Sequence, residues 1–190
     1  MQKRTHEIVI VVDFGSQYSH LIARRIREQN VYSKIVSYKI TPEEIKQLNP
    51  KGIILSGGPA SVYVSNAPRC DEKILFMDIP VLGICYGFQL GSQILGAEIK
   101  ASENREYGKT KCTIKDHTSL FDDTLGDSID VWMSHGDQAI GLPEDFHSLA
   151  NTVTCPYAAV KHKEKNFYGV QFHPEVTHTP DGKQILKNFL

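Results

Sequence analysis

The chain has 190 residues, 41% of them hydrophobic and 23% charged, so it is long enough to bury the core of one globular domain. Its formal net charge is -1 and its sequence pI is about 6.7, which leaves no overall basic field to hold a nucleic-acid backbone. The longest apolar run near the start, residues 8–12, is too short for a signal sequence or a membrane span. We therefore expect a cytoplasmic protein that binds neither nucleic acid nor a membrane.

Short apolar runs alternate with helical patterns through the first half of the chain. This rhythm is typical of an α/β domain with a buried, largely parallel sheet. Strands are predicted at residues 8–12, 32–37, 52–56 and 80–84. Residues 18–30 predict a helix with an apolar stripe through Ile22 and Ile26, and we expect its arginine run to face solvent.

The next helix has a clear start signal in the segment TPEEIKQL. Thr41 and Glu44 predict a capping box, and Pro42 occupies the first helical position. A further helix is predicted for YGFQLGSQIL, directly after the fourth strand.

The pattern loosens beyond Gly96 into alternating segments at residues 109–114, 129–134, 157–162 and 167–172, which suit antiparallel or edge strands. The last ten residues look helical and stop without a cap, so we expect the natural chain to continue past Leu190. No repeat, low-complexity tract or linker is visible, and a single domain over residues 1–190 is predicted.

The four cysteines, Cys70, Cys85, Cys112 and Cys155, lie far apart and include no C-x-x-C pair. Their spacing suggests neither a disulfide framework nor a zinc knuckle. Three of them are expected to be small buried hydrophobic residues. The surroundings of Cys85 set it apart.

Cys85 stands between Gly83 and Gly87 at the junction of a predicted strand and helix. A G-x-C-x-G at that place has the form of a nucleophile elbow, in which small neighbours allow a tight turn that exposes the thiol at the carboxyl end of the sheet. The helix dipole there favours a thiolate. A buried structural cysteine, with glycines that let helix and strand pack closely, is an equal alternative.

The segment VQFHPEVTHT supplies a candidate base. Pro174 biases His173 toward extended geometry, so that His173 and Glu175 project to the same side. With Cys85 they provide a nucleophile, a base and a carboxylate that fixes the imidazole tautomer. The alternatives are a surface loop histidine or a metal cluster with His178, and we expect no metal because Pro174 argues against one helical ligand face.

Two glycines end the third predicted strand in LSGGPASVY. The backbone N–H of Gly58 and that of Tyr86, just after the nucleophile, could form an oxyanion hole. The alternative interpretation is a phosphate-binding loop. It is weakened because Pro59 lacks an N–H and because the Lys-Ser/Thr that a Walker loop requires does not follow the glycines. A purely structural turn also remains open.

Taken together, GICYGFQ, SGGP and FHPEV, in that order and spacing, resemble the class I glutamine amidotransferases. The further motifs REYG at residues 105–108 and WMSHGD at residues 132–137 look like those of the glutaminase domains of GMP synthases, and the resemblance covers essentially the whole chain. It implies a three-layer α/β fold in which helices flank a central, largely parallel mixed sheet, with the nucleophile elbow after a central strand.

The resemblance also implies the reaction: hydrolysis of L-glutamine to glutamate and ammonia through a thioester on Cys85, with His173 as the base and Glu175 holding its ring. The implied substrate-binding residues are Gly57, Gln89, Ser134, His135 and Asp137. Gln89 could instead be an ordinary exposed helix residue. Arg105 and its REYG motif could belong to a strand-end turn or to a partner interface.

GMP synthases also need an ATP pyrophosphatase module that adenylates xanthosine monophosphate, and none follows here. The resemblance therefore implies a partner, either a synthetase domain or a synthetase subunit, with ATP and magnesium bound there and no cofactor in this chain. The chain would be either a separate subunit or an excised domain, and its uncapped end favours excision. Such a glutaminase is expected to be slow until its charged partner is present.

Two other functions stay open. One is an idle module that senses glutamine or holds a partner without hydrolysing anything, although the intact Cys85, His173 and Glu175 speak against it. The other is a related thiol hydrolase that cleaves γ-glutamyl peptides and has no ammonia acceptor.

Overall fold

A computed structural model describes residues 7–190, with only the backbone of Glu103. The strands are β1 (Ile8–Asp13), β2 (Tyr32–Ser37), β3 (Gly52–Leu55), β4 (Val81–Ile84), β5 (Glu98–Ile114), β6 (Ser128–Gly141), β7 (Phe146–Asn151), β8 (Ala159–His162) and β9 (Phe167–Val170). The helices are α1 (Ser19–Arg27), α2 (Pro42–Leu48), α3 (Tyr86–Ile94) and α4 (Gly182–Phe189), with a 3-10 helix η1 at Glu72–Phe76. The predicted domain over residues 1–190 includes residues 1–6, which lie outside the described range.

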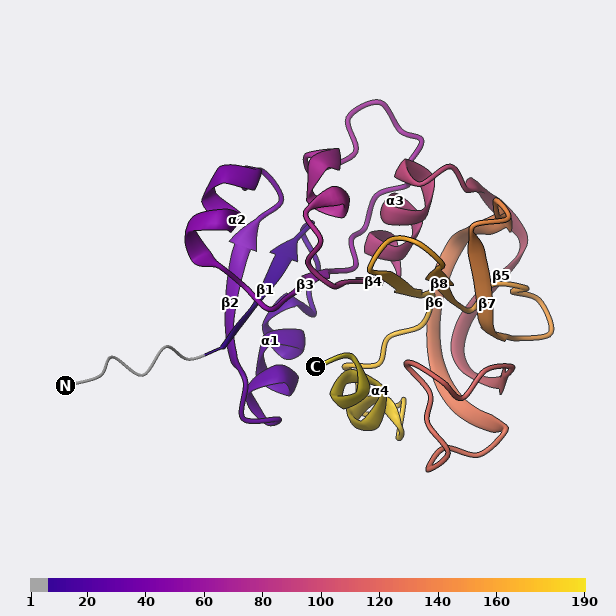
Figure 1. Cartoon of the computed structure of the whole chain (residues 1–190). Helices are drawn as coiled ribbons and strands as arrows, with labels where there is room; N and C mark the ends of the chain where they lie inside the picture. Colours follow the sequence, from indigo (N-terminus) through magenta and orange to yellow (C-terminus); the bar gives the residue numbers. More distant parts are fainter. Residues whose placement is uncertain (1–6) are drawn as a thin grey trace.

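The strands form one mixed sheet in the order β2-β1-β3-β4-β9-β8-β7-β5-β6 (Figure 1). The first five are parallel to one another, and the pairings from β9 through β8, β7 and β5 to β6 are antiparallel. Every residue of β3 and β4 is buried, because helices cover both faces of the parallel half. The predicted α/β class with a largely parallel, mixed sheet is confirmed.

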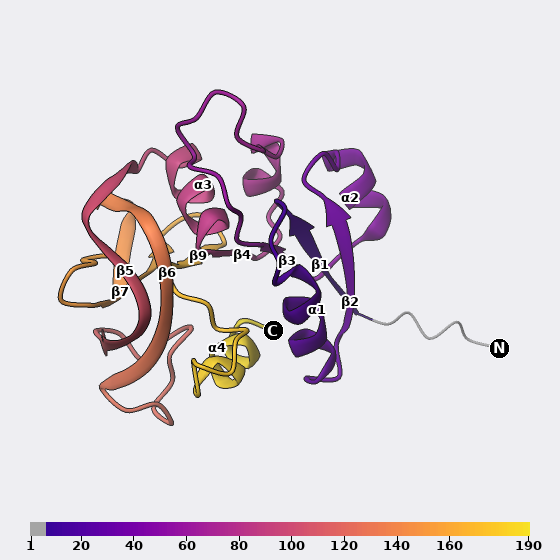
Figure 2. The ribbon, with the colours of Figure 1, turned by 180° about the vertical axis from the view of Figure 1, so that it is seen from behind.

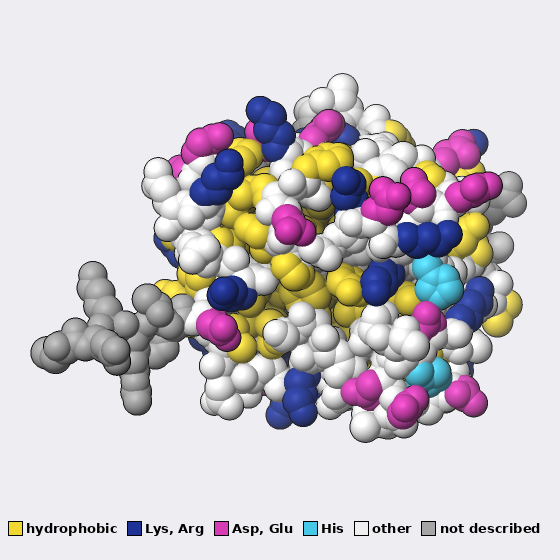
Figure 3. All heavy atoms as spheres, viewed as in Figure 1, with side chains coloured by type: hydrophobic (Ala, Val, Ile, Leu, Met, Phe, Trp, Pro, Cys, Tyr) yellow, Lys and Arg dark blue, Asp and Glu magenta, His cyan; other side chains and the backbone are white. Residues whose placement is uncertain are grey.

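Helices enclose the sheet as two outer layers. In both views α1 and α4 lie on one face of the parallel strands, and α2, η1 and α3 lie on the other (Figure 1 and Figure 2). Val11 of β1 belongs to the core shared with α1 and α4, whereas Val12 belongs to the core shared with α2 and α3, as the alternation of a strand requires. On the face shown in Figure 3, basic and acidic side chains are interspersed around an apolar middle.

The helix predictions hold with one correction. The capping box of α2 is present, since the Glu44 N–H donates to Thr41 Oγ1 and Glu44 Oε2 accepts from the Thr41 N–H. Arg24 and Arg27 of the arginine run in α1 are exposed, as predicted, although Arg27 Nε also donates to Ser33 Oγ. The correction concerns Arg25, which is half-buried and whose Nε donates to the backbone carbonyl of Glu175 at 2.9 Å.

The second half of the sheet departs more from expectation. The four segments predicted to be antiparallel or edge strands lie in β5, β6, β8 and β9, and each has an antiparallel neighbour, as predicted. The prediction did not include the second pairing of β9, which is parallel to β4 and makes β9 an interior strand. β7 was not predicted, since its sequence FHSLAN lacks a regular apolar pattern. The REYG motif lies within the 17-residue β5, so the interpretation as a strand-end turn is wrong.

None of the described helices is suited to cross a membrane. Between residues 7 and 190, no helix has the length and the apolar character that such a crossing requires.

Candidate active site

A cavity of about 640 Å³ opens at the carboxyl ends of the parallel strands, where ligands of open α/β sheets bind. Its walls come from the segments that follow β1, β3, β4 and β9 and from the β5–β6 pair. Of the predicted site residues, the cavity is lined by Gly58, Cys85, Tyr86, Gln89, Ser134, His135, Asp137 and His173. Gly57 and Glu175 lie behind this lining.

Cys85 joins β4 to α3 in a strained backbone conformation, with φ of 50° and ψ of -106°. Positive φ is costly for a residue with a side chain and is common at active sites. A Cβ on Gly83 would lie 2.6 Å from Cα of Phe88, and a Cβ on Gly87 would strike the carbonyl oxygen of Leu55. The predicted elbow geometry is confirmed, and the absence of side chains at these two glycines lets α3 pack closely against the strands.

Besides His173, two polar groups lie near the thiol of Cys85. Sγ lies 3.7 Å from the carbonyl oxygen of Ser134 and 3.7 Å from Nε2 of Gln171. Gln171 is fully buried and its Oε1 accepts a hydrogen bond from Gln89. The sequence reasoning missed Gln171, although it stands two residues before His173 and so projects to the same side of an extended segment.

His173 and Glu175 form the pair that the HPE segment predicts. His173 Nδ1 lies 2.8 Å from Glu175 Oε1, and the two residues are 5% and 0% exposed. Because a carboxylate only accepts, Nδ1 carries a proton and Nε2 is the nitrogen left for proton transfer. Oε2 of Glu175 has no donor among the described residues, so His173 is the sole side-chain partner of this carboxylate there.

The protonation of His173 is governed by its neighbours. Burial favours the neutral ring, but the hydrogen bonds to Cys85 and Glu175 and the negative charges of both outweigh it and raise the pKa of His173 to about 10. The His173 ring therefore holds its proton at neutral pH.

Several contacts fix the position of the His173 ring. The Tyr18 ring packs edge-on against it at 5.3 Å between centroids, and a Cβ on Gly57 would lie 3.3 Å from its Cε1. Its backbone N–H donates to Trp132 O, and its carbonyl accepts from Thr179 Oγ1. Gly57 thus supports the base instead of lining the cavity.

The predicted oxyanion donors, Gly58 and Tyr86, both line the cavity beside Cys85. Within residues 7–190, neither backbone N–H donates to another protein group. A Cβ on Gly58 would come within 3.1 Å of the Phe14 carbonyl oxygen, so this backbone is closely packed in place. The two N–H groups are free to receive a developing negative charge.

The opposite wall comes from α3 and β6. Gln89 is 3% exposed, so the alternative of an exposed helix residue is wrong, and its Nε2 donates to the Asp137 carbonyl at 2.8 Å. Asp137 Oδ1 accepts from the Tyr63 hydroxyl at 2.8 Å. Both ring nitrogens of His135 contact protein acceptors, Asp137 O and Glu106 Oε2, so His135 has only its backbone left for a ligand.

A β-bulge brings an unpredicted cation to the cavity. The register of β5 against β6 shifts between Ala101, which pairs with Asp137, and Glu106, which pairs with His135. Residues 102–105 therefore bulge out opposite the single residue Gly136. Arg105 and Tyr107 line the cavity from this segment, and a Cβ on Gly136 would lie 3.7 Å from Arg105 Nε. The REYG motif was the available signal, but its alternation does not reveal the bulge.

The structure gives no support to a metal cluster around His173. His178 packs on the Trp132 ring at 4.4 Å between centroids. Within the described residues, the group with ligand atoms close enough for an ion is Glu106, His135 and Cys155. Both Glu106 oxygens already accept hydrogen bonds, and burial raises the pKa of Cys155 to about 12, so this cysteine remains a thiol and the set does not suit a metal.

A thiol on a strand–helix elbow, beside a buried His–Glu pair in a cavity at the carboxyl edge of the sheet, is typical of cysteine-dependent acyl transfer. The family model described as glutamine amidotransferase class-I matches residues 10–190, and the chain belongs to that family.

Named relatives come from several bacteria. The chain is 56% identical over 184 residues to a protein named GMP synthase [glutamine-hydrolyzing] from Caldanaerobacter subterraneus subsp. tengcongensis, with 97% of this chain and 36% of that relative covered. It is 53% identical over 190 residues to the Bacillus subtilis protein of the same name, with 100% and 37% covered. The chain therefore spans a little over a third of the length of these curated relatives.

Solved structures share the fold. A Thermoplasma acidophilum protein, described as a proposed subunit of GMP synthase, superposes with a TM-score of 0.86 at 34% identity and covers 97% of this chain and 92% of its own. A glutamine amidotransferase from Thermotoga maritima, at 22% identity with 90% and 77% covered, has a TM-score of 0.72 and shows the fold alone.

Proposed function

We propose that this chain hydrolyses L-glutamine to L-glutamate and ammonia, with Cys85 as nucleophile, His173 as proton carrier and Glu175 as its orienter. The observation that carries the proposal is the strained Cys85 facing one cavity with the buried His173–Glu175 pair. Membership of the class-I family and the names of the relatives support it.

In the first half of the reaction, the Cys85 thiolate attacks the side-chain amide carbon of glutamine. Negative charge moves to the amide oxygen, where the Gly58 and Tyr86 N–H groups would stabilise it. His173 gives its proton to the amide nitrogen, the carbon–nitrogen bond breaks, and ammonia leaves behind a γ-glutamyl thioester on Cys85.

In the second half, neutral His173 takes a proton from a water molecule that attacks the thioester. The carbon–sulfur bond breaks, glutamate leaves, and the thiolate–imidazolium pair is restored. Because Glu175 accepts from Nδ1 at 2.8 Å throughout, every proton passes through Nε2.

The cavity also carries charges that suit the other end of the substrate. Free glutamine has an α-ammonium and an α-carboxylate group. Asp137 would attract the ammonium and Arg105 the carboxylate, and both line the cavity. Gln89, Ser134 and the backbone of His135 would complete the wall around this end, with Gly57 behind it.

The ammonia would be consumed by an ATP pyrophosphatase domain or subunit that converts xanthosine monophosphate to GMP in the cytoplasm. This part of the proposal rests on the names of relatives that are much longer than the chain. ATP and magnesium would bind that partner, and the chain itself would use no cofactor.

Glutamate release from L-glutamine tests the proposal, with and without a GMP synthetase partner charged with ATP, magnesium and xanthosine monophosphate. Release should require Cys85, rise with the charged partner, and survive the matched change Cys70→Ala, whose thiol is buried outside the cavity. Release that persists in Cys85→Ala would contradict the proposal. A preference for γ-glutamyl peptides over glutamine would favour the peptide hydrolase instead.

A further inference from the structure

Two buried residues, His135 in the cavity wall and Glu106 behind it, have side chains that take no direct part in the chemistry proposed above. Glu106 of β5 and His135 of β6 stand opposite each other in the sheet register. Their side chains are 8% and 1% exposed, and His135 Nε2 lies 3.0 Å from Glu106 Oε2. A buried charge persists only when it is paired and hydrogen-bonded, so the remaining contacts decide the state of this pair.

The hydrogen-bond partners require His135 to carry two protons. Nδ1 faces the Asp137 carbonyl oxygen at 3.0 Å, which can only accept, so Nδ1 must donate. Nε2 faces Glu106, whose other oxygen accepts from the hydroxyls of Thr152 at 2.7 Å and Thr154 at 2.6 Å. With Glu106 ionised, Nε2 must also donate, and the ring is an imidazolium.

The ionisation of Glu106 agrees with its surroundings. Burial alone would raise the pKa of this carboxyl, but the hydrogen bonds from His135, Thr154 and Thr152 outweigh burial and hold the pKa below its usual value. The pair therefore consists of an imidazolium and a carboxylate with four short hydrogen bonds between them and their neighbours.

The backbone that this pair holds is the wall of the cavity. The Asp137 carbonyl accepts both His135 Nδ1–H and Gln89 Nε2–H, at 3.0 and 2.8 Å. On the other side of His135, the Ser134 carbonyl is the oxygen that lies 3.7 Å from Cys85 Sγ. A change at Glu106 would therefore reach residues 134–137 through the His135 ring, without touching the cavity itself.

We propose that Glu106 is a positioning residue for substrate binding: its ion pair with His135 holds residues 134–137 in the shape that receives the amino-acid end of glutamine. The inference rests on the proposed function and deepens it. It differs from a purely structural role, because loss of the charge should weaken substrate binding in protein that is still folded.

The test uses the whole chain and a diazoketone analogue of L-glutamine that alkylates the nucleophilic thiol. Saturation kinetics of Cys85 labelling, read by mass spectrometry, separate the binding constant KI from the maximal rate kinact. Glu106→Gln should raise KI roughly tenfold to a hundredfold, the range that corresponds to the loss of a buried charged hydrogen bond, and change kinact less than about threefold. Glu106→Asp, which keeps the charge, should recover part of the affinity.

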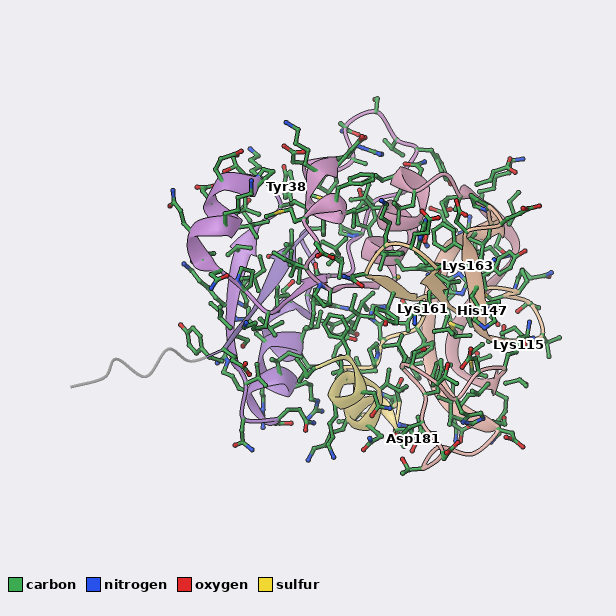
Figure 4. All side chains as sticks on the ribbon, in the orientation of Figure 1. Tyr38, Lys115, His147, Lys161, Lys163 and Asp181 are labelled. Atoms are coloured by element: carbon green, nitrogen blue, oxygen red, sulfur yellow. The ribbon has the colours of Figure 1, made fainter. Side chains whose placement is uncertain are left out.

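Two controls accompany this variant. Iodoacetamide needs no amino-acid pocket, so its rate at Cys85 should change little in Glu106→Gln. Asp116→Asn breaks another His–carboxylate pair of the chain, His147 Nε2 to Asp116 Oδ2 at 2.8 Å, which lies outside the cavity lining. Figure 4 shows His147 with Lys115 and Lys161 on the side of the antiparallel strands. Asp116→Asn should leave KI unchanged.

The outcomes separate the inference from the function on which it rests. A Glu106→Gln protein that melts at a lower temperature yet keeps the wild-type KI overturns the positioning role and leaves the glutaminase standing. A wild-type chain that reacts with iodoacetamide but never with the glutamine analogue overturns the proposed function. If Glu106→Gln does not fold, Thr154→Val, which removes one hydrogen bond to Glu106 Oε1, should raise KI by about threefold, and an unchanged KI there also overturns the inference.

Discussion

The two halves of the sheet contribute different things to the site. In the parallel half, short buried strands end at one edge and deliver Cys85 from β4 and His173 from the segment after β9. In the antiparallel half, the long β5–β6 ribbon supplies Arg105, His135 and Asp137 to the same cavity from within its strands. The chemistry thus lies at strand ends, and the proposed substrate recognition lies on a bulged ribbon.

The difference reflects how each half is held. β4 is paired on both sides, and glycines bring α3 against β3 and β4, so the nucleophile has little freedom. β6 is an edge strand with one neighbour, and its cavity-facing residues depend on side-chain contacts such as Glu106 to His135. Changes in the parallel half should therefore alter kcat or folding, and changes in the ribbon should alter KM.

The largest effect is expected at the base. Glu175→Gln keeps the shape of the side chain but removes the charge that orients the His173 imidazolium, so kcat should fall by roughly 10³ to 10⁴ with little change in KM. Steady-state glutamate release in the presence of the charged partner measures both. Glu164→Gln, an exposed acid outside the cavity, is the control. A raised KM with an intact kcat would break the proposed division between the halves.

The elbow should be the next most sensitive place. In Gly87→Ala the new Cβ strikes the Leu55 carbonyl on the neighbouring strand, so the free energy of unfolding should drop by about 3 kcal/mol or more. Urea unfolding followed by circular dichroism measures the loss. Gly126→Ala, whose nearest atom is 4.0 Å away, should lie within about 0.5 kcal/mol of wild type. Equal stability of the two variants would show that the elbow tolerates a shift of α3.

The pH dependence of stability tests the His173–Glu175 pair. The pKa of His173 is raised to about 10 in the folded chain, above its ordinary value of about 6.5 when unfolded. The stabilisation is therefore complete below about pH 6.5 and is lost as pH rises toward 10, with a slope of at most about 1.4 kcal/mol per pH unit.

Urea unfolding of wild type and Glu175→Gln between pH 6.5 and 10 measures this effect, since Cys85 is common to both. The stability difference between the two should narrow as pH rises. A difference that stays constant or widens would show that Glu175 does not raise the affinity of the ring for its proton.

The smallest effect is expected in the ribbon. Arg105→Gln removes the cation that lines the cavity opposite Asp137, so KM for glutamine should rise about tenfold while kcat changes less than about threefold. Glutaminamide, which lacks the α-carboxylate, provides the control substrate, because its KM should not respond to this change. An equal rise for both substrates would assign Arg105 to the shape of the wall and not to the carboxylate.

Much of the parallel half could be predicted from the sequence, because its signals are local. The strands of residues 8–12 and 32–37, the capping box at Thr41 and the helix after Cys85 all appear close to their predicted places. The strand of residues 8–12 is covered on both faces, so it reads as a continuous apolar run. The HPE segment likewise brought His173 and Glu175 together because their spacing is two residues.

The ribbon could not be predicted in the same way. An alternating pattern fits any half-buried strand and carries no information about which strand lies beside it, so the parallel pairing of β9 with β4 was not predicted and β7 was missed. The bulge before Glu106 is set by the pairing with β6, and it decides that Arg105 reaches the cavity. Gln171 and Glu106 were missed for the same reason, since their partners lie far along the chain.

The sequence by itself determined the α/β class, the strand–helix corner at Cys85 and the types of residue available for acyl transfer, because apolar periodicity, glycines and closely spaced motifs act over a few residues. Only the tertiary structure decided that Cys85 and His173, 88 residues apart in the numbering, lie at one edge of the sheet. It alone also decided that the His135 ring is hydrogen-bonded to Glu106. Both contacts depend on the order and register of the strands, which arise from packing across the whole sheet and cannot be inferred from any short segment.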